Sequence, residues 1–290
     1  MAAPLTDSAP AKINLTLRVL GRRADGYHDL ESLVAFAGLA DTLAFEPGGG
    51  TTLGVGGPYA AACGEPAGNL VLKAHRALSD LVPGLEGGRF VLDKKLPVAA
   101  GIGGGSADAA AALRLLARAN DISFDDARLM TAALRTGADV PVCVASRACI
   151  MTGVGERLSP PLDLPPLHAV LVNPGAALAT RDVFAAYRVK PQPPALAAHE
   201  VPRDRGALIE FLKAHGNDLT GAAISCAPVV ADVLRALDAA PGVLLSRMSG
   251  SGSTCFALFA AAEGAATAAA RLAAAHKDWW VAPTVFGGRT

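Results

Sequence analysis

Three consecutive glycines, Gly103, Gly104 and Gly105, precede Ser106 and a long run of helix formers. The first N–H groups of a helix have no partner inside the helix and carry roughly half a positive charge, so they bind anions. Glycine lets the chain turn sharply there and lets an anion approach without meeting a Cβ atom. The pattern favours a phosphate-binding loop with Ser106 as the helix N-cap over a flexible loop that happens to precede a helix.

Two common phosphate-binding motifs do not fit this segment. A Walker A loop needs a lysine and then Ser or Thr after its last glycine, and neither follows Gly105. A dinucleotide-binding fingerprint that starts at Gly101 needs a third glycine at position 106, where this chain has serine. The segment therefore belongs to another class of nucleotide site.

Asp139 is the second residue whose position suggests chemistry. Gly137 fits the C′ position of a helix expected over 125–136, and Pro141 favours extended backbone at the residue before it. Asp139 is therefore predicted on a short turn between that helix and a strand over 140–145, VPVCVA. An aspartate in a turn is ordinarily a turn former, and a proton acceptor is the functional alternative.

Lys12 and Asn14 are the third feature, because they lie side by side in an alternating segment. Over 11–20, apolar residues occupy every second position from Ile13 to Val19, which predicts a half-buried strand. Lys12 and Asn14 belong to its polar face. By itself this places Lys12 among solvated surface lysines, and a role beside a reacting group is the alternative.

The elements that must position these residues mix strands and helices, so the class is α and β. Asn69 is a good N-cap for a helix over 70–81. The tract 158–167 holds four prolines in ten residues and marks a domain boundary, which divides the chain into 1–160 and 161–290. Further predictions are strands near 29–36, 41–46, 89–93, 168–173, 243–248, 254–260 and 280–286, helices up to 119 and near 181–187, 205–215, 228–239 and 263–275, and a proline-rich surface loop over 189–204.

Composition bounds the class of protein. The 290 residues are 51% apolar and 18% charged, which suits a packed core and gives no sign of disorder. Lys plus Arg and Asp plus Glu number 26 each, so no bulk positive field favours nucleic acid or an anionic membrane as a partner. The five scattered cysteines form no CxxC pair, and no segment reaches the roughly 18 apolar residues of a spanning helix. We expect a soluble, cytoplasmic protein with reduced thiols.

The glycine-rich segment resembles the phosphate-binding motif of the GHMP kinases, whose pattern P-x-x-x-G-[LI]-G-G-G-[SA] begins here at Pro97. PAKINLTL, ADGYHDLESLV, GADVPVCV, GVGERL and SGSGSTCF occur in the order typical of this family, over about residues 9–260. PAKINL, DGYH and GADVP together are typical of the member that phosphorylates the 2-hydroxyl of a cytidine diphosphate sugar alcohol on the non-mevalonate route to isoprenoids. The departures are Ala99 and Ala100 where glycines are frequent, Ile102 in place of leucine and Ala107 in place of serine.

The resemblance implies a two-domain α+β fold. It would have an N-terminal ribosomal-protein-S5-like domain and a C-terminal ferredoxin-like domain, with the active-site cleft between them. It also implies ATP and Mg²⁺ as cofactors and a small-molecule acceptor as the partner. We expect a monomer or a weak homodimer.

The resemblance also implies roles for individual residues. Asp139 would accept the hydroxyl proton, and Lys12 would lie beside it and keep it ionised. Tyr27 and Phe184 would stack on the cytosine ring and His28 would contact its edge; Ser106 would reach a phosphate or Mg²⁺. The other implied substrate contacts are Asn14, Thr180 and Gly250. The implied ATP contacts are Asn69, Pro97, Ala100, Gly101, Gly103, Gly104, Gly105, Ser106, Ala107 and Lys94, with Lys95 as the alternative to Lys94.

Two other functions compete with this interpretation. One is a different small-alcohol kinase of the same superfamily, such as a homoserine or mevalonate-type kinase. The other is a catalytically silent ATP-binding or RNA-binding module, because the N-terminal domain type also resembles a ribosomal protein fold. The neutral net charge argues against RNA, and the presence of both Lys12 and Asp139 argues against a silent module.

Overall fold

In the computed structural model, which describes residues 4–189 and 196–287, the chain forms two compact units. Each unit is assembled from three segments, whereas the sequence predicted a single division near residue 160, which stays a prediction. The predicted cleft between domains also stays a prediction. Unit 1 comprises Met1–Ala11, Leu39–Val98 and Gly103–Ser146, and unit 2 comprises Lys12–Gly38, Ala99–Ile102 and Arg147–Thr290.

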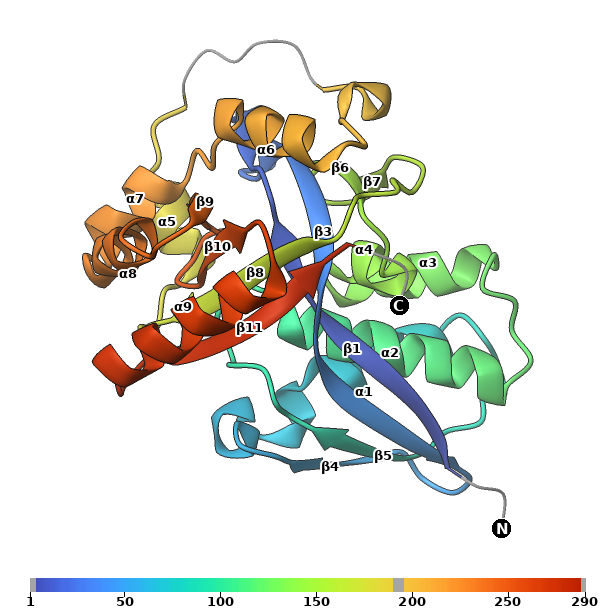
Figure 1. Ribbon diagram of the computed structural model, residues 1–290. Helices are drawn as coiled ribbons and strands as arrows, with labels where there is room; N and C mark the ends of the chain where they lie inside the picture. The colour runs from blue at the N-terminus through green and yellow to red at the C-terminus, as the bar shows by residue number, and fades with distance from the viewer. Residues whose placement is uncertain (1–3, 190–195, 288–290) are drawn as a thin grey trace. The chain divides into compact units, whose positions relative to one another are not determined.

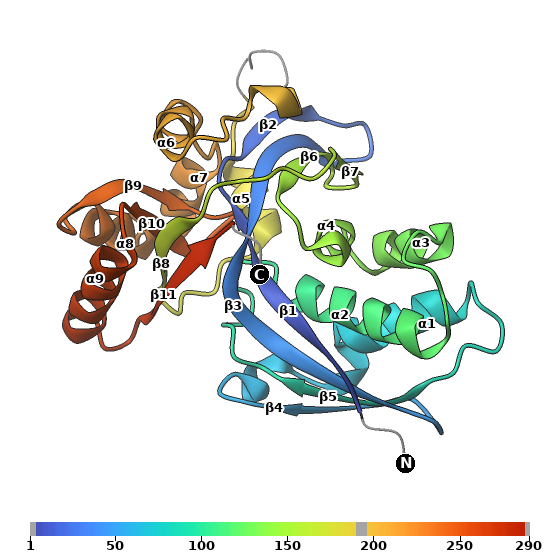
Figure 2. The same ribbon diagram turned by 45° about the vertical axis from the view of Figure 1, so that its right-hand side comes forward.

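Unit 1 packs helices on one face of a small sheet (Figures 1 and 2). Strand β4 pairs parallel with β5, and β5 pairs antiparallel with the second half of β3. Helix α1 connects the two parallel strands and lies beside α2. The elements are β1 (Leu5–Asn14), β3 (His28–Pro47), β4 (Thr52–Gly56), β5 (Gly88–Asp93), α1 (Leu70–Ser79), α2 (Gly104–Ala119), α3 (Ala127–Thr136) and α4 (Val140–Ala145), with short 3-10 turns at Ala60–Cys63 and Pro66–Gly68.

Unit 2 contains an antiparallel sheet in the order β11-β8-β10-β9. Helices α8 and α9 contact this sheet, and Figure 1 shows α9 running along β11. In chain order the strands and these helices follow the ferredoxin-like pattern β-α-β-β-α-β, as the resemblance implied. The bounds are β8 (Leu167–Asn173), α8 (Val229–Asp238), β9 (Val243–Met248), β10 (Cys255–Phe259), α9 (Ala262–Ala275) and β11 (Trp280–Phe286).

The rest of unit 2 extends from the first half of β3, which pairs with β2 and β6 and contacts β11 through Ala37 and Phe286. The sheet core follows simple periodicity: alternate residues of β8 and β10 are buried against residues of α8 and α9 at helical spacing. The remaining elements are β2 (Arg18–Arg22), β6 (Cys149–Gly153), β7 (Arg157–Leu158), α5 (Thr180–Ala186), α6 (Arg205–Ala214), α7 (Thr220–Cys226) and a 3-10 turn at Ala198–Glu200.

Several predictions from the sequence are confirmed. The Asn69 side chain accepts a hydrogen bond from Val71 N at 2.9 Å and caps α1. The proline tract 158–167, predicted to mark a domain boundary, joins β7 to β8 inside unit 2, so its role as a boundary stays a prediction. Of the predicted surface loop 189–204, residues 190–195 lie outside the described residues. The strands predicted near 29–36 and 41–46 are one strand, β3, and the sequence pattern missed α7, β4, β6 and β7.

Two local predictions are wrong. Residues 140–145 form helix α4 and not a strand, because Pro141 occupies the first helical turn, where proline removes no intrahelical hydrogen bond. The predicted strand over 11–20 is interrupted: β1 ends at Asn14, and β2 begins at Arg18. Residues 11–19 are buried on both faces, so this segment is not half-exposed.

Candidate active site

The glycine run opens α2 in a way that leaves its N-terminus bare. Gly103 is the N-cap and has the left-handed conformation, with φ 62° and ψ 18°, which favours glycine. Its carbonyl accepts from Ala107 N at 2.8 Å, and it has no side chain to accept from the first N–H groups. The prediction that Ser106 caps the helix is therefore wrong. Ser106 is the third residue of α2, and its half-buried side chain lies within the first turn of the helix.

The entry to this run, Ala99–Ile102, packs against the loop 249–254 between β9 and β10, both in unit 2. A Cβ atom on Gly101 would overlap the backbone of Gly252, so the two glycines permit a direct backbone approach. Thr254 donates to Ala100 O from its N at 3.1 Å and from its Oγ1 at 2.6 Å. The two glycine-rich motifs found in the sequence are thus held together by main-chain contacts.

Lys12 and Asn14 are buried, with 4% and 1% of their surfaces exposed, so the interpretation of Lys12 as a solvated surface lysine is wrong. Lys12 Nζ donates to Asn14 Oδ1 at 2.9 Å, and Asn14 Nδ2 donates to Ser32 Oγ at 2.7 Å. The backbone N–H of Asn14 donates to Ser249 Oγ at 3.1 Å, and that of Lys12 donates to Ile102 O at 2.9 Å. The end of β1 is therefore fixed to both glycine-rich segments of unit 2.

Asp139, in unit 1, is half-buried and occupies the N-cap position of α4. It follows the extended Gly137, whose carbonyl accepts from Val140 N at 3.1 Å. The Asp139 side chain makes no capping hydrogen bond to its own helix. Its carboxylate is therefore not committed to the role that an aspartate at a helix start usually has.

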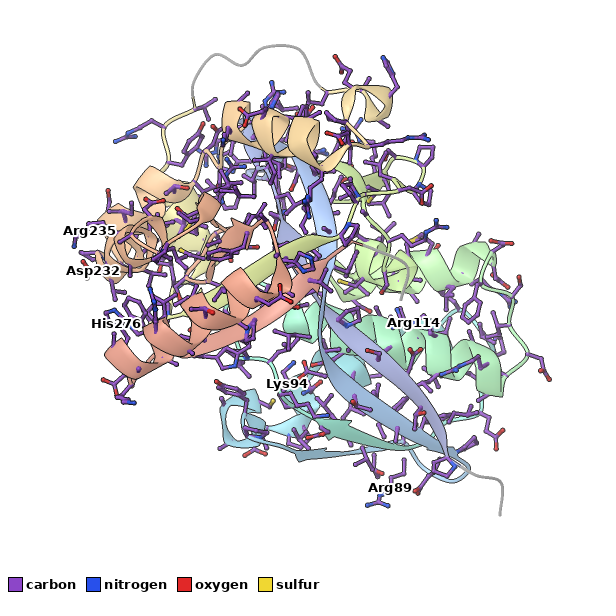
Figure 3. The ribbon with its side chains drawn as sticks, viewed as in Figure 1. Arg89, Lys94, Arg114, Asp232, Arg235 and His276 are labelled. Atoms are coloured by element: carbon purple, nitrogen blue, oxygen red, sulfur yellow. The ribbon has the colours of Figure 1, made fainter. Side chains whose placement is uncertain are left out.

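Lys94 lies in a buried cluster of charges in unit 1 (Figure 3). Its Nζ is 2.6 Å from Asp41 Oδ2 and 2.5 Å from Asp108 Oδ2. Burial disfavours its positive charge, but the two carboxylates outweigh burial and raise the pKa of Lys94. Burial raises the pKa of Asp108 to about 7, against the effect of the Lys94 charge. Lys95, by contrast, has an exposed side chain that pairs with Asp93 at 3.0 Å.

The cluster reaches the glycine-rich segment from two directions. Asp41 Oδ1 accepts from the backbone N of Lys95 at 2.5 Å and of Leu96 at 2.8 Å, and so fixes the chain that leads into the segment. A Cβ atom on Gly104 would lie 3.3 Å from Lys94 Nζ. Gly104 therefore leaves room for the lysine, whereas Gly105 is exposed and faces only Leu70.

The residues predicted to recognise cytosine gather near one end of β3. The rings of His28 and Phe184 stack with their centroids 4.9 Å apart, while Tyr27 is 65% exposed. Burial, and secondarily the charge of Arg22, lowers the pKa of His28 below its ordinary value of 6.5. The structure thus brings Phe184 together with His28, while the Tyr27 side chain is mostly exposed to solvent.

The loop 249–254 has supports that the sequence pattern did not single out. Asn217 is buried and donates from Nδ2 to Met248 O and to Gly250 O, both at 2.8 Å, while its Oδ1 accepts from Leu219 N at 3.0 Å. The predicted contact Thr180 shares a hydrogen bond of 2.9 Å with Ser251 Oγ. Asn217 precedes Asp218 in an ordinary turn sequence, GND, so only the folded chain reveals its function.

The donors available for Mg²⁺ suit an ion held mainly by nucleotide phosphates. Among the described residues, no group of three or more His, Cys, Asp and Glu side chains is placed to hold a metal. Mg²⁺ prefers oxygen ligands and commonly takes several of them from substrate phosphates. The Ser106 hydroxyl, on the first turn of α2, is an oxygen of this class, so the residues present fit such an ion.

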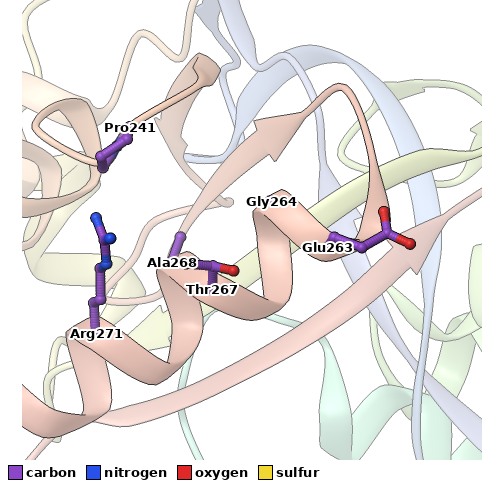
Figure 4. Close-up of a pocket in the computed structure, with 6 residues that line it drawn as sticks. All are labelled: Pro241, Glu263, Gly264, Thr267, Ala268 and Arg271. Atoms are coloured by element: carbon purple, nitrogen blue, oxygen red, sulfur yellow. The ribbon is translucent and has the colours of Figure 1, made fainter.

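A separate depression of about 250 Å³ lies on unit 2 (Figure 4). It contains none of the predicted site residues, and its lining belongs to α9 and the turn before β9. Those residues are Pro241, Glu263, Gly264, Thr267, Ala268 and Arg271.

Comparison with known proteins identifies the family. The model of the GHMP kinases N terminal domain matches residues 69–147, and the model of the GHMP kinases C terminal domain matches residues 194–278. The chain belongs to the GHMP kinases.

Named relatives within the GHMP kinases are similar over almost the whole chain. Proteins named 4-diphosphocytidyl-2-C-methyl-D-erythritol kinase from Rhodopseudomonas palustris strain HaA2 and Bradyrhizobium sp. strain BTAi1 are each 56% identical. The alignments cover 96% of this chain in both cases, and 96% and 95% of the respective relatives.

Solved GHMP kinase structures agree. A crystal structure of 4-(cytidine 5'-diphospho)-2C-methyl-D-erythritol kinase superposes with a TM-score of 0.79 at 35% identity, covering 98% of this chain and all of that one. A homoserine kinase from Cytophaga hutchinsonii, at 18% identity and TM-score 0.65 over 98% of each chain, shares the fold. In the described ranges, none of the helices combines the length and apolar character needed to cross a membrane.

Proposed function

We propose that this GHMP kinase transfers the γ-phosphoryl group of ATP to the 2-hydroxyl of 4-diphosphocytidyl-2-C-methyl-D-erythritol, on the non-mevalonate route to isoprenoid precursors. The names and the extent of its relatives support this substrate. The observation that carries the reaction type is the bare N-terminus of α2 behind the left-handed Gly103. A helix start without a side-chain cap presents its N–H groups to an anion.

The phosphates of ATP would bind at the N-terminus of α2. The N–H groups of Gly104 and Gly105 and the hydroxyl of Ser106 would contact the phosphates, and the Ser106 hydroxyl would also offer an oxygen to Mg²⁺. Asn69 contacts the adenosine while its side chain caps α1. Bound Mg²⁺ neutralises phosphate charge. Lys94 remains a proposed contact of the nucleotide, and its pairing with Asp41 and Asp108, which balances its charge, holds it beside the start of α2.

Asp139 is the proton acceptor in the proposed reaction. As the substrate oxygen bonds to the γ-phosphorus, its O–H bond breaks and the proton moves to the Asp139 carboxylate. The bond between the γ-phosphorus and the bridging oxygen breaks, and that oxygen leaves on ADP. Lys12 supplies the positive charge that the proposal places beside Asp139. Asn14, which holds the Lys12 ammonium, orients it and contacts the acceptor alcohol.

The cytidine end of the substrate binds at the aromatic residues of unit 2. Phe184 stacks on one face of the cytosine, Tyr27 covers the other, and His28 or the backbone beside it contacts the edge. Thr180 and Gly250 contact the diphosphate side. For a base stacked on an aromatic ring, the usual contribution is about 1–3 kcal/mol. We also place the enzyme in the cytoplasm, as a monomer or weak homodimer, consistent with its five free cysteines.

ADP release tests the proposal directly. The enzyme is assayed in parallel with the cytidine diphosphate sugar alcohol, homoserine and mevalonate. We expect turnover of the first alone, and preferred turnover of another alcohol would favour a different kinase of the family. Asp139→Asn should lower kcat by about 10²–10⁴-fold with little change in either KM, because general base catalysis contributes that much. A variant that keeps most of its kcat would return Asp139 to a structural role.

Base selectivity tests the cytosine site. A site built to hydrogen-bond one edge rejects the wrong edge because its own buried groups stay unpaired, so the uridine analogue should have a much lower kcat/KM. Phe184→Ala should weaken both analogues by a similar factor, whereas His28→Ala should narrow the gap between them. Equal kcat/KM values in the unaltered enzyme would exclude cytidine recognition.

The pH dependence of the same site follows from His28. Because the pKa of His28 is lowered below 6.5, the ring is neutral above that pH and charges only at lower pH. A charged ring cannot accept a hydrogen bond, so KM for the cytidine substrate should stay constant above pH 6.5 and rise below it. A KM profile unchanged by His28→Ala would show that another group causes the rise.

A further inference from the structure

Arg114 connects two parts of unit 1 that the proposed reaction uses. It lies on α2, two turns after Ser106, and its side chain is only 14% exposed (Figure 3). Its Nη1 donates to Cys143 O at 2.7 Å and to Val144 O at 3.3 Å. These two carbonyls belong to the last turn of α4, the helix that begins directly after Asp139.

Helix α4 needs such external support. It has six residues, and helices shorter than about 12 residues are marginal by themselves. The last carbonyls of a helix have no partner inside it, and a cation at that end also interacts favourably with the helix dipole. Ser146 Oγ donates to Cys143 O at 2.6 Å within the same turn, and Arg114 connects these carbonyls to another helix, α2.

The guanidinium is itself held rigidly. Its Nη2 donates to Ser8 O at 2.8 Å, and its Nε donates to Asp7 Oδ2 at 3.0 Å. The planar fork of arginine therefore uses one edge on the strand β1 and the other on α4. With both edges engaged, the side chain cannot swing without breaking several hydrogen bonds together.

We propose that Arg114 is a positioning residue for phosphoryl transfer: through α4 it holds the carboxylate of Asp139 at a fixed distance from the phosphate-binding start of α2. Helix α2 carries both Arg114 and, at its N-terminus, the proposed phosphate-binding site. Ser106 and Arg114 are eight residues apart on α2, which corresponds to about 12 Å along its axis. This inference rests on the role of Asp139 in the proposed function.

A double-mutant cycle tests it. Arg114→Met keeps the apolar stem and removes the donors, and we expect kcat to fall roughly 10–100-fold, since a misplacement of about 1 Å can cost 10²-fold. The Kd for ATP should change less than twofold, because the start of α2 is untouched. In an Asp139→Asn background, Arg114→Met should lower kcat no further than about twofold, because the group that it positions is gone.

Matched variants separate positioning from stability. Arg118→Met removes an arginine one turn along α2 that donates to Thr6 O of the same strand, and it should leave kcat within twofold. Arg114→Lys, which keeps a cation and one donor, should recover part of the lost kcat. If Arg114→Met does not fold by circular dichroism, Arg114→Lys replaces it in the cycle.

The outcomes distinguish two failures. An equal loss of kcat from the Arg114 substitution with and without Asp139 would overturn the positioning role and leave the proposed function intact. An Asp139→Asn enzyme with full kcat would overturn the role of Asp139 in the proposed function, and this inference with it. A loss of kcat that Arg114→Met causes only when Asp139 is present confirms both the positioning role of Arg114 and the role of Asp139.

Discussion

The two glycine- and serine-rich segments, 99–106 and 249–254, have similar composition but use their glycines differently. In the first, Gly103 turns the chain into α2, and the following glycines are helical. In the second, Gly250 and Gly252 have φ values of 56° and 86° in a connection between two antiparallel strands. The first therefore ends in free helix N–H groups, whereas the second is a scaffold that other groups hold in shape.

The comparison shows that glycine is required for three separate physical reasons. Gly103 and Gly250 supply a left-handed conformation, and Gly101 permits the backbone of Gly252 to approach. Gly104 leaves space for the Lys94 ammonium. Only Gly105 has no such structural duty in its surroundings, so it is the glycine whose absent side chain most directly serves a ligand.

The largest expected effect concerns the support of the first segment. Lys94→Met leaves Asp41 and Asp108 buried without their shared cation, which should cost about 3–5 kcal/mol of unfolding free energy. Urea unfolding measures this loss. Lys95→Met is the matched control, because Lys95 forms an exposed pair with Asp93 and should cost no more than about 1 kcal/mol. Equal losses for the two lysines would contradict the difference between a buried cluster and a surface pair.

The next effect separates structural from ligand-serving glycines. Gly101→Ala puts a Cβ atom into the backbone of Gly252 at a φ of 74°, and it should cost about 2–4 kcal/mol from strain and overpacking. Gly105→Ala lies in a helix with room for a methyl group and should stabilise the fold by about 0.5–1 kcal/mol. The same variant should nevertheless raise the Kd for ATP more than tenfold. Titration calorimetry with ATP measures this Kd on the folded Gly105→Ala protein, and an unchanged Kd would show that Gly105 does not serve the nucleotide.

Most of the elements and the phosphate loop were predictable from local pattern. Asn69 caps α1 as its sequence predicts, and the glycine run stands before α2, because capping and helix periodicity depend on neighbours in the chain. The ferredoxin-like order of β8 to β11 agrees with the family resemblance, which carries topology that periodicity lacks.

Several errors arise because a local pattern does not contain the contacts of distant segments, whereas the N-cap of α2 was a wrong choice between nearby residues, Gly103 and Ser106. Lys12 alternates with apolar residues like a surface lysine, but it is buried, and its backbone N donates to Ile102 O, ninety residues further along the chain. VPVCVA has the β-branched composition of a strand, yet it is a helix packed against α2 and held by Arg114. Asn217 contacts Gly250 from more than thirty residues away, and Arg114 acts on Asp139 only through helix α4. No spacing rule in the sequence therefore identifies either residue.

A smaller loss of stability is expected when Asn217, which supports the loop 249–254, is replaced. Asn217→Asp keeps the oxygen that accepts from Leu219 N but replaces the donors to Met248 O and Gly250 O with an acceptor. Leaving these buried carbonyls unpaired should cost about 1–3 kcal/mol of stability. A lower kcat/KM should accompany it, because Gly250 lies against Gly101 and Asn14.

Asn173→Asp is the control for that substitution. Asn173 Nδ2 donates to the Thr254 hydroxyl at 2.9 Å, and that hydroxyl donates its own proton to Ala100 O. The hydroxyl can turn toward a carboxylate by giving up that one bond, whereas the two carbonyls that Asn217 serves have no proton to donate. Thermal unfolding should therefore rank Asn217→Asp as the more damaging of the two. The reverse ranking would show that loop 249–254 depends on its hydroxyl contacts instead.

The smallest effect concerns the two alanines at the entry to the first segment. Ala99 has a φ of 54°, a conformation that costs a residue with a Cβ roughly 1–2 kcal/mol. Ala99→Gly removes this strain but adds conformational freedom to the unfolded chain, which costs about 0.4–1 kcal/mol, so a net gain in stability between about 0 and 1.6 kcal/mol is expected. Ala100, one residue later, is buried and has no such strain, so Ala100→Gly should lose about 0.5–1 kcal/mol instead. Opposite signs from neighbouring, chemically identical substitutions, measured by urea unfolding, would establish that backbone conformation sets the preference for glycine at this entry. Destabilisation by both would mean that the methyl group of Ala99 contributes packing that exceeds its strain.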